Sequence, residues 1–336
     1  MTASFETLLF PLQSGTIVPK GRTLVMGAFP HPYLRVLTPD VWQPFKPLAD
    51  GLAGLNRLGH IPSDPLYDLV LVDIPKQVDE AKFWMASALY ALKPDGILVL
   101  AAANDANGNR LSKWVRDLGL AGDSDSRNKS RIVVTHRPEA LSPLVSEWFD
   151  NGKKQKVETG DGYSFLSQPG VFGWNKIDDG SRLLSQKIPS GLGGIGADFG
   201  AGTGYLSARI LLSCPDVKTL YVAEADARAL ECARENLENV RQDRTLEFLW
   251  ADLTKPAALP ALDFIVMNPP FHHGKKTDPH IGLSFIATAA HHLKKNGKLY
   301  VVANAHLPYE QSLRSAFSSV RLLAEEQGFK IYEAQR

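Results

Sequence analysis

The sequence has few of the features that direct a chain to a membrane or to an oxidising compartment. Only two cysteines occur among 336 residues, Cys214 and Cys232, and their spacing is not that of metal ligands. No apolar run reaches the roughly 18 residues of a membrane helix. The N-terminus lacks the basic start and the apolar core of a signal peptide. These absences exclude a disulfide scaffold and favour a protein of the cytoplasm.

A strong net charge of either sign is also missing. The formal net charge is +1, which excludes global electrostatic attraction to nucleic acid but is compatible with a local basic surface. A hydrophobic content of 44% and a charged content of 22% are those of a folded globular protein. A chain of 336 residues suits two domains of about 150 residues each.

The chain repeats a pattern of strand, helix, tight turn and strand. YDLVLVDIPK (67–76) resembles LDFIVMNPPF (262–271), and ALYALKPDGILVLAAAND (88–105) resembles AAHHLKKNGKLYVVANAH (289–306). Apolar strands joined through an amphipathic helix are typical of parallel sheets. We therefore predict an α/β fold with two tandem doubly wound, Rossmann-like domains that are related by duplication.

A glycine-rich turn follows the first predicted strand of the second half. IGADFGAGTGYLSARILL passes from strand to helix, with Asp198, Gly200, Gly202 and Gly204 at the turn. Glycines let the backbone approach a ligand closely, and the first N–H groups of the next helix favour an anionic group. The spacing does not fit the dinucleotide fingerprint G-x-G-x-x-G. It resembles the S-adenosylmethionine site of class I methyltransferases.

Two carboxylates follow at the ends of the next predicted strands. TLYVAEAD brings Glu224 to a position where it can accept hydrogen bonds from ribose hydroxyls. Asp226 is expected to cap the following helix. LEFLWADL brings Asp252 either to the adenine amine or merely to a surface loop. The first half has one glycine at the comparable place, in TLVMGAFPHPYL, and is predicted to be a degenerate copy that has lost the cofactor.

The apolar strand predicted in the second copy ends on the tetrapeptide Asn268, Pro269, Pro270 and Phe271. Proline cannot extend a sheet, and ligands of doubly wound sheets bind beyond the carboxyl ends of the strands. The side-chain carbonyl of Asn268 and the backbone carbonyl of Pro269 can together accept both hydrogens of a planar amine. Phe271 offers a ring for a flipped base. We predict that these residues are catalytic and that Asn268 also contacts the cofactor; the alternative is a rigid turn.

This tetrapeptide after a strand is similar to that of the amine methyltransferases of nucleic acids. Together with the degenerate N-terminal copy, it makes the chain resemble the ribosomal RNA guanine-N2 methyltransferases of the RsmC/RlmG type. PGVFGWNKIDDGSRLL (169–184) is similar to the segment that leads into that family's catalytic domain, where Phe172, Asp178 and Gly180 lie near the cofactor. The resemblance implies an S-adenosylmethionine-dependent enzyme that methylates a guanine amine in ribosomal RNA, with 16S rRNA as the expected substrate.

The resemblance also implies a division of labour between two domains. Residues 156–336 would form the catalytic domain, and residues 1–155 would support RNA binding or stability. The expected partner is ribosomal RNA or a ribosomal subunit, with no membrane, and we expect a monomer. Methyl transfer from a sulfonium needs no metal, and His272, His273 and His280 lack the further ligands of a metal site.

Two alternatives to this function stay open. One is an amine methyltransferase of another substrate, namely a 23S rRNA guanine, adenine N6 in nucleic acid, or a protein glutamine. The other is an RNA-binding assembly factor without catalytic activity.

Overall fold

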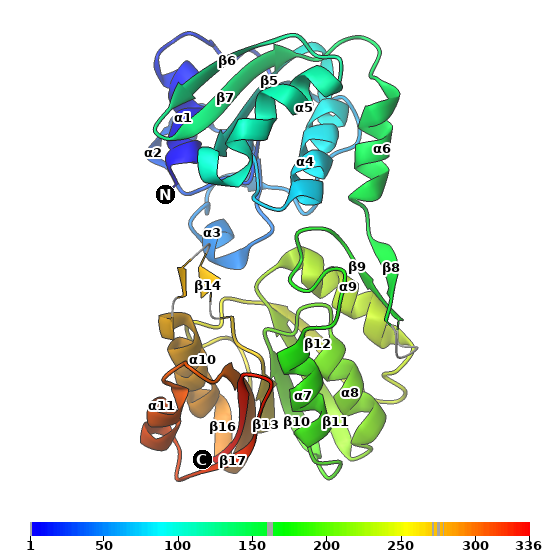
Figure 1. The fold of residues 1–336 in the computed structure, drawn as a ribbon, viewed down its shortest axis with the longest axis vertical. Coiled ribbons are helices and arrows are strands. Elements are labelled where there is room, and N and C mark those ends of the chain that lie inside the picture. The colour runs from blue at the N-terminus through cyan, green and yellow to red at the C-terminus, as the bar shows by residue number, and fades with distance from the viewer. Residues whose placement is uncertain (1, 160–163, 271, 274–275, 278) are drawn as a thin grey trace. The chain divides into compact units, whose positions relative to one another are not determined.

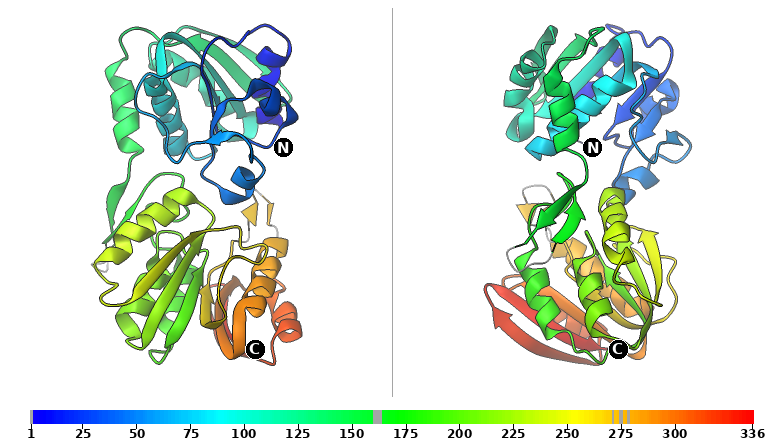
Figure 2. Two further views of the ribbon diagram at one scale, coloured as in Figure 1. Left: turned by 180° about the vertical axis from the view of Figure 1, so that it is seen from behind. Right: turned by 90° about the vertical axis from the view of Figure 1, so that its right-hand side faces the viewer.

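The computed structural model divides into two compact units, Met1–Lys153 and Lys154–Arg336. The residues that it describes are 2–159, 164–270, 272–273, 276–277 and 279–336. Each unit contains a seven-stranded sheet with helices on both faces (Figure 1, Figure 2). The predicted α/β fold with two doubly wound domains is confirmed. The separate functions predicted for the two domains stay predictions.

The sheet of the N-terminal unit has the strand order β3-β2-β1-β4-β5-β7-β6. Its strands are β1 (Thr23–Met26), β2 (Asp40–Trp42), β3 (Asn56–Arg57), β4 (Tyr67–Asp73), β5 (Leu92–Ala103), β6 (Gly122–Arg127) and β7 (Ser130–His136). One face packs against α1 (Ala3–Gln13) and α2 (Pro32–Leu37), and the other against α4 (Val78–Ala91), α5 (Asn109–Asp117) and α6 (Pro143–Asn151). A short helix, α3 (Lys46–Asp50), precedes β3, and a π-helical turn, η1 (Asn104–Gly108), follows β5.

The sheet of the C-terminal unit has the order β12-β11-β10-β13-β16-β18-β17. Its strands are β10 (Gly194–Phe199), β11 (Val217–Glu224), β12 (Thr245–Trp250), β13 (Leu262–Met267), β16 (Leu293–Asn304), β17 (Ser319–Glu326) and β18 (Phe329–Gln335). One face carries α7 (Asp179–Lys187), α8 (Tyr205–Ser213) and α9 (Ala227–Glu238), and the other carries α10 (Pro279–His292) and α11 (Tyr309–Ala316). Two hairpins lie outside the sheet: β8 (Gln155–Glu158) with β9 (Ser164–Ser167), and β14 (His272–His273) with β15 (Lys276–Thr277).

The two sheets match position by position, so that β13 and β16 occupy the places of β4 and β5. A turn near the start of β5 has Asp95 at φ 62°, and a turn near the start of β16 has Asn296 at φ 66°. Asp and Asn tolerate this left-handed conformation better than most residues. An ion pair beside each turn is also repeated, between Lys93 and Asp68 (2.9 Å) and between Lys294 and Asp263 (2.7 Å). The sequence repeat therefore reflects a duplicated structure.

The sheets are mixed, whereas the sequence pattern led us to expect parallel sheets. In the C-terminal unit β18 is antiparallel to both β16 and β17, and in the N-terminal unit β7 is antiparallel to β5 and β6. The last two strands are joined by a two-residue turn with positive φ at Gln327 (53°) and Gly328 (81°). Such turns favour β-hairpins, which reverse the chain without a crossover helix.

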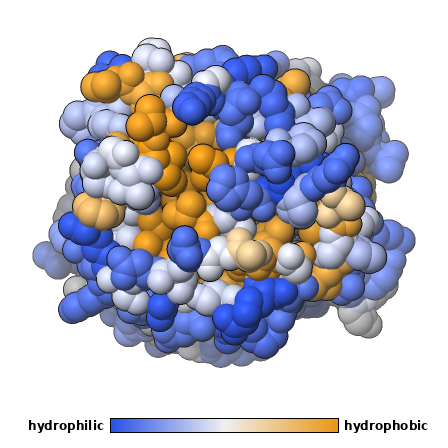
Figure 3. All heavy atoms as spheres, turned by 90° about the horizontal axis from the view of Figure 1, so that it is seen from above, coloured by the Kyte–Doolittle hydropathy of each residue, from blue (hydrophilic) through white to orange (hydrophobic). Residues whose placement is uncertain are grey.

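The surface is mostly hydrophilic where Figure 3 shows it, with patches of apolar residues among the polar ones. The large apolar side chains that are exposed are Val18, Val36, Phe45, Leu66, Phe172, Leu212 and Leu322. Among the described residues, no helix combines the length and the apolar character needed to cross a membrane.

Candidate active site

The glycine turn lies where β10 ends and α8 begins. Gly200, Gly202 and Gly204 have φ values of 73°, 56° and 87°, in the left-handed region that favours glycine. The N–H of Gly200 donates to the Ala223 carbonyl at 2.9 Å, which fixes the turn to the neighbouring β11. A Cβ placed on Gly202 would meet no atom within 4 Å. The turn therefore presents bare backbone to an open space.

Asp198 lies beneath this turn and is fully buried. Its Oδ2 accepts hydrogen bonds from the backbone N–H of Ser207 (2.9 Å) and from the Ser207 hydroxyl (2.7 Å). Burial raises the pKa of Asp198 to about 7. The carboxyl group thus fastens the first turn of α8 to the end of β10, and its predicted contact with a cofactor stays a prediction.

Glu224 ends β11 beside the turn. Its carboxylate accepts hydrogen bonds from the N–H groups of Gly202 (2.8 Å), Ala225 (2.7 Å) and Asp226 (2.9 Å). Burial raises the pKa of Glu224 above its usual value. An ionised carboxylate has about four lone-pair sites, so this group retains capacity for a further donor such as a ribose hydroxyl.

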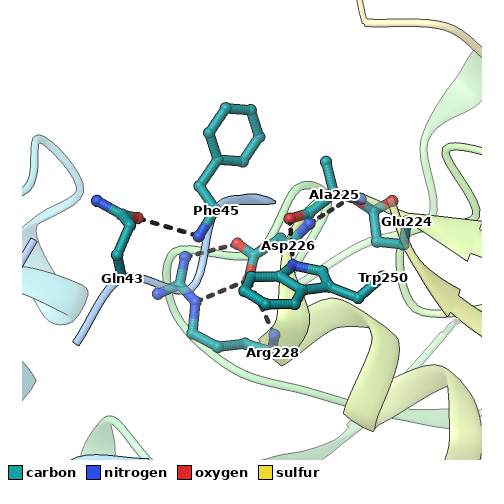
Figure 4. A network of polar contacts seen from close by, with 7 residues as sticks. All are labelled: Gln43, Phe45, Glu224, Ala225, Asp226, Arg228 and Trp250. Carbon is teal, nitrogen blue, oxygen red and sulfur yellow. Dashed lines mark hydrogen bonds and ion pairs between the residues drawn. The ribbon is translucent and has the colours of Figure 1, made fainter. Parts of the chain in front are cut away.

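Asp226 has a separate structural task, as Figure 4 shows. It is the N-cap of α9 and accepts from the N–H of Arg228 at 2.9 Å. The Arg228 guanidinium makes two further bonds to the same carboxylate, at 3.0 Å and 2.6 Å. Trp250 Nε1 donates to the Ala225 carbonyl at 2.8 Å and closes the turn after β11. The prediction that Asp226 caps this helix is confirmed.

Asp252 lies just beyond β12, where its side chain bonds to its own loop. Its Oδ1 accepts from the N–H of Thr254 (3.1 Å) and from the Thr254 hydroxyl (2.6 Å), and Lys255 Nζ lies 3.4 Å from Oδ2. These contacts are those of a loop carboxylate. The predicted contact with the adenine amine stays a prediction.

Asn268 follows β13, and both hydrogens of its side-chain amide are bonded. Nδ2 donates to Asp178 Oδ2 at 2.7 Å and to Ser181 Oγ at 2.8 Å. Asp178 is the N-cap of α7, and the same Oδ2 accepts from the Ser181 N–H at 2.8 Å. These bonds leave the amide oxygen of Asn268 as the end of the side chain that can accept from a ligand.

An open cavity joins these elements. It is lined by residues of the segment 172–181, by the glycine turn, by Phe165 and Tyr205, and by Asn268. Phe172, whose side chain is 68% exposed, lies at this cavity. Glu224 and Asp252 are outside this lining, although the Gly202 N–H that bonds Glu224 belongs to it. The structure thus brings Phe172, Asp178, Gly200, Gly202 and Asn268 together.

The rest of the tetrapeptide is only partly described. Pro269 is buried and Pro270 is exposed. Phe271 lies outside the described residues, as do the side chains of His272 and His273. Among the described residues, no group of three or more His, Cys, Asp or Glu side chains could hold a metal ion.

Two residues of this site were missed in the sequence. Ser181 bonds the Asn268 amide, and Asn236 on α9 fastens the glycine turn. Asn236 Nδ2 donates to the carbonyls of Thr203 and Leu166, both at 2.9 Å, and its Oδ1 accepts from the Leu166 N–H at 2.7 Å. Asparagine is a poor residue for a helix interior, which was the available signal for a task beyond helix formation.

In the N-terminal unit, the turn that matches the glycine turn carries a large side chain where the glycine turn has none. Gly27 occupies the place of Gly200, since its N–H donates to the Trp42 carbonyl of β2 at 2.9 Å. A Cβ on Gly27 would lie 2.7 Å from the Trp84 ring. Phe29, two residues further on, packs against the fully buried Phe5 with ring centroids 5.5 Å apart. Phe29 therefore places an aromatic side chain where Gly202 leaves bare backbone.

The carboxylate at the end of β11 is also replaced in the N-terminal unit. Gln43 occupies the place of Glu224: its Oε1 accepts from the N–H of Phe45 at 3.0 Å, as Glu224 accepts from Asp226 (Figure 4). The Gln43 amide nitrogen donates to the Ala28 carbonyl at 2.9 Å. This neutral amide has one acceptor oxygen where a carboxylate has two, and its nitrogen is bonded to the backbone.

A seven-stranded sheet with this order, a glycine turn after its first strand and an acidic residue at the end of the next strand define a class I methyltransferase. The residues fit S-adenosylmethionine, because Gly202 leaves the space that a bound ligand needs and Glu224 retains acceptor capacity beside it. The model of the family described as "Methyltransferase small domain" matches residues 162–333. The protein is therefore an S-adenosylmethionine-dependent methyltransferase.

Two relatives show to which family of methyltransferases the chain belongs. The chain is 30% identical to ribosomal RNA small subunit methyltransferase C of Shewanella pealeana over 280 residues, which are 82% of this chain and 80% of the relative. It is also 30% identical to the protein of the same name from Aeromonas hydrophila, over 85% of this chain and 81% of that one. The chain thus belongs to the family of ribosomal RNA small subunit methyltransferase C.

One solved structure shares the complete fold. It is the 16S rRNA methyltransferase RsmC of T. thermophilus in complex with AdoMet and guanosine, with a TM-score of 0.81 and 22% identity. The match covers 99% of this chain and 93% of the other.

The asymmetry between the units predicts one S-adenosylmethionine site per chain. Calorimetric titration of the full chain is expected to give a stoichiometry near one, because Phe29 takes the place of Gly202 and Gln43 takes the place of Glu224 in the N-terminal unit. A stoichiometry near two would contradict this.

Asp73 ends β4 of the N-terminal unit, at the position that Asn268 has after β13. Its buried carboxyl group predicts a stability that depends on pH. Burial raises the pKa of Asp73 to about 7 in the folded protein. The folded state therefore binds this proton more tightly than the unfolded state, and the stabilisation present at acidic pH is lost as the pH rises through 7. Asp73→Asn removes this titrating group. The difference in unfolding free energy between Asp73→Asn and the wild type should therefore shift by about 2–3 kcal/mol in favour of the variant as the pH rises from about 5 to about 8. Denaturant titrations at both pH values test this, and a constant difference would contradict it.

Proposed function

We propose that the protein transfers the methyl group of S-adenosylmethionine to the exocyclic N2 amine of a guanine in 16S rRNA. The orientation of the Asn268 amide is the observation that carries the proposal. Two bonds hold its nitrogen on the side of α7, at 2.7 Å and 2.8 Å, so the oxygen is the group offered at the cavity. The names of the relatives support ribosomal RNA as the substrate class.

An amide oxygen presented in this way matches the chemistry of an exocyclic amine. The guanine N2 group carries two hydrogens in the plane of the base, and Asn268 Oδ1 with the Pro269 carbonyl would accept one each. Holding both hydrogens orients the nitrogen lone pair toward the methyl carbon, and such positioning lowers the barrier without a further catalyst. The bound cofactor supplies an electrophilic methyl group. The N–C bond forms as the C–S bond breaks, the electron pair remains on sulfur, and the nitrogen then releases one proton to solvent.

The remaining residues of the site are proposed to hold the cofactor. Gly200, Gly202 and Gly204 would let it approach the backbone, and Phe172 would cover the open side of the cavity. Four carboxylates are proposed to lie at the cofactor. Glu224 would contact its ribose and Asp252 its adenine, and Asp178 and Asp198 would lie near the rest of the cofactor. Phe271 is proposed as the ring that stacks on the target base, a contact that is worth about 1–3 kcal/mol.

The N-terminal unit is proposed to support RNA binding or stability, and the protein to act in the cytoplasm as a monomer. Because Phe29 and Gln43 replace Gly202 and Glu224 in the N-terminal unit, this unit would contribute through its surface and not through a cofactor.

Transfer of a labelled methyl group from S-adenosylmethionine to purified RNA tests the proposal. We expect label in 16S rRNA or in the small subunit, and nuclease digestion should release it as N2-methylguanosine. Label in N6-methyladenosine, in 23S rRNA or in protein would identify one of the other substrates. Absence of label together with absence of cofactor binding would indicate an assembly factor without activity.

A further inference from the structure

We propose that Asp178 and Ser181 are positioning residues, which hold the Asn268 amide in the orientation that presents its oxygen to the target amine. This inference rests on the proposed function. It assigns to the first turn of α7 a task in the reaction that is distinct from contact with the cofactor.

The orientation follows from the kinds of group involved. Asp178 offers a carboxylate oxygen, which accepts hydrogen bonds and has no hydrogen to donate. If the amide were reversed, its oxygen would face this carboxylate oxygen at 2.7 Å without a hydrogen between them. The carboxylate partner therefore allows only one orientation of the amide. Hydrogen bonds to ionised groups are also stronger than those between neutral groups.

The two partners are themselves fixed by the helix. Asp178 caps α7, and Ser181 lies three residues later, so both side chains project from the same end of the helix toward the end of β13. Leu183 and Leu184 of the same helix are buried in the core between α7, α8 and the sheet. The Asn268 amide is therefore held by a rigid element and not by a loop.

The N-terminal unit shows the corresponding position without this device. Thr2 caps α1 there, and its hydroxyl lies 3.5 Å from Asp73 Oδ2 at the end of β4. A carboxyl group replaces the amide, and Asp73 Oδ1 is buried without a hydrogen-bond partner among the described residues. The pairing of an amide with an acceptor on the capping residue thus occurs in the unit that has the open cavity.

Asp178→Ser separates positioning from helix capping. Serine is as good an N-cap as aspartate, so α7 should remain intact. A hydroxyl can donate as well as accept, so it no longer enforces one amide orientation. We expect kcat at saturating S-adenosylmethionine to fall about 10-fold, whereas Ser181→Ala should lower kcat about 3-fold. Asp179→Ser is the matched control, since it removes the neighbouring exposed carboxylate of the same helix. Equal kcat values for Asp178→Ser and Asp179→Ser would overturn the proposal.

The pH profile of Asn268→Asp gives a readout that a merely structural role would not change. The new carboxyl would face Asp178 at the 2.7 Å now spanned by the amide bond, and two carboxylates so close share one proton. While that proton is present, the new group can donate to Asp178 and offer its carbonyl oxygen as the amide does. Methyl transfer should therefore fall as the pH rises through the upper apparent pKa of the pair. In the double variant with Asp178→Ser this step should move to lower pH. A profile that Asp178→Ser does not change would overturn the proposal.

A measurement without catalysis separates this inference from the proposed function. The two side-chain amide protons of Asn268, assigned by comparison with Asn268→Ala, can be followed by NMR in the free protein. We expect slow exchange with solvent in the wild type and in Asp179→Ser, and at least 10-fold faster exchange in Asp178→Ser. Equal exchange in all three would overturn the inference even if guanine is methylated. Protected protons in a protein that methylates no guanine would overturn only the proposed function.

Discussion

Asn268→Ala is expected to slow methyl transfer by about 10²–10³-fold and to leave S-adenosylmethionine affinity nearly unchanged. The amide oxygen is offered to the amine that reacts, so its contribution is greatest when that amine approaches the methyl carbon. An interaction made chiefly in the transition state appears in kcat and not in binding. Single-turnover rates at saturating cofactor, with calorimetry of cofactor binding, measure the two effects separately.

Asn304→Ala is the matched control for this substitution. Asn304 ends β16, the strand next to β13, and its buried side-chain nitrogen has no hydrogen-bond partner in the part of the chain that the structure describes. We expect it to react at nearly the wild-type rate. A wild-type rate in Asn268→Ala would mean that the tetrapeptide is a rigid turn with a structural purpose.

The second large effect is expected for Gly202→Val, which should weaken S-adenosylmethionine binding about 100-fold or more. The backbone at Gly202 has a φ of 56°, and the space before it belongs to the cavity. A valine side chain would occupy that space and would also adopt a conformation that a β-branched residue disfavours.

Gly328→Val distinguishes blocking of the cavity from backbone strain. Gly328 also has a positive φ, 81°, and a Cβ there would likewise meet no atom within 4 Å, but it lies in the turn between β17 and β18. We expect this variant to be destabilised and still to bind the cofactor with wild-type affinity. Calorimetry of cofactor binding to both variants distinguishes blocking of the cavity from backbone strain. Unchanged affinity in Gly202→Val would refute the placement of the ligand at this turn.

The internal repeat accounts for most of what the sequence could predict. The repeat predicted β4 and β13, the helices after them and the turns near the start of β5 and β16. Each of these elements has a local pattern of apolar residues, glycine and Asp or Asn. The antiparallel end of each sheet was missed. Strand direction depends on the connection, and the two-residue turn at Gln327 and Gly328 was the signal that would have shown a hairpin.

The site was predictable where a residue acts through its own chemistry and unpredictable where it acts through a distant partner. Asn268 was found because an amide followed by two prolines suits no strand. Its bond to Asp178 joins residues 90 positions apart, and no local pattern indicates which donor meets which acceptor across such a separation. The resemblance placed Asp178 near the cofactor, but no local pattern indicated its bonds to Asn268 and to the first turn of α7.

Mass mapping of modified nucleotides in ribosomal RNA from cells that lack this protein tests whether the chain methylates a guanine of 16S rRNA. We expect that one N2-methylguanosine disappears from 16S rRNA, returns when the wild-type chain is supplied, and stays absent when Asn268→Ala is supplied. An unchanged pattern of modification in 16S rRNA would show that the chain is not a guanine-N2 methyltransferase of this RNA.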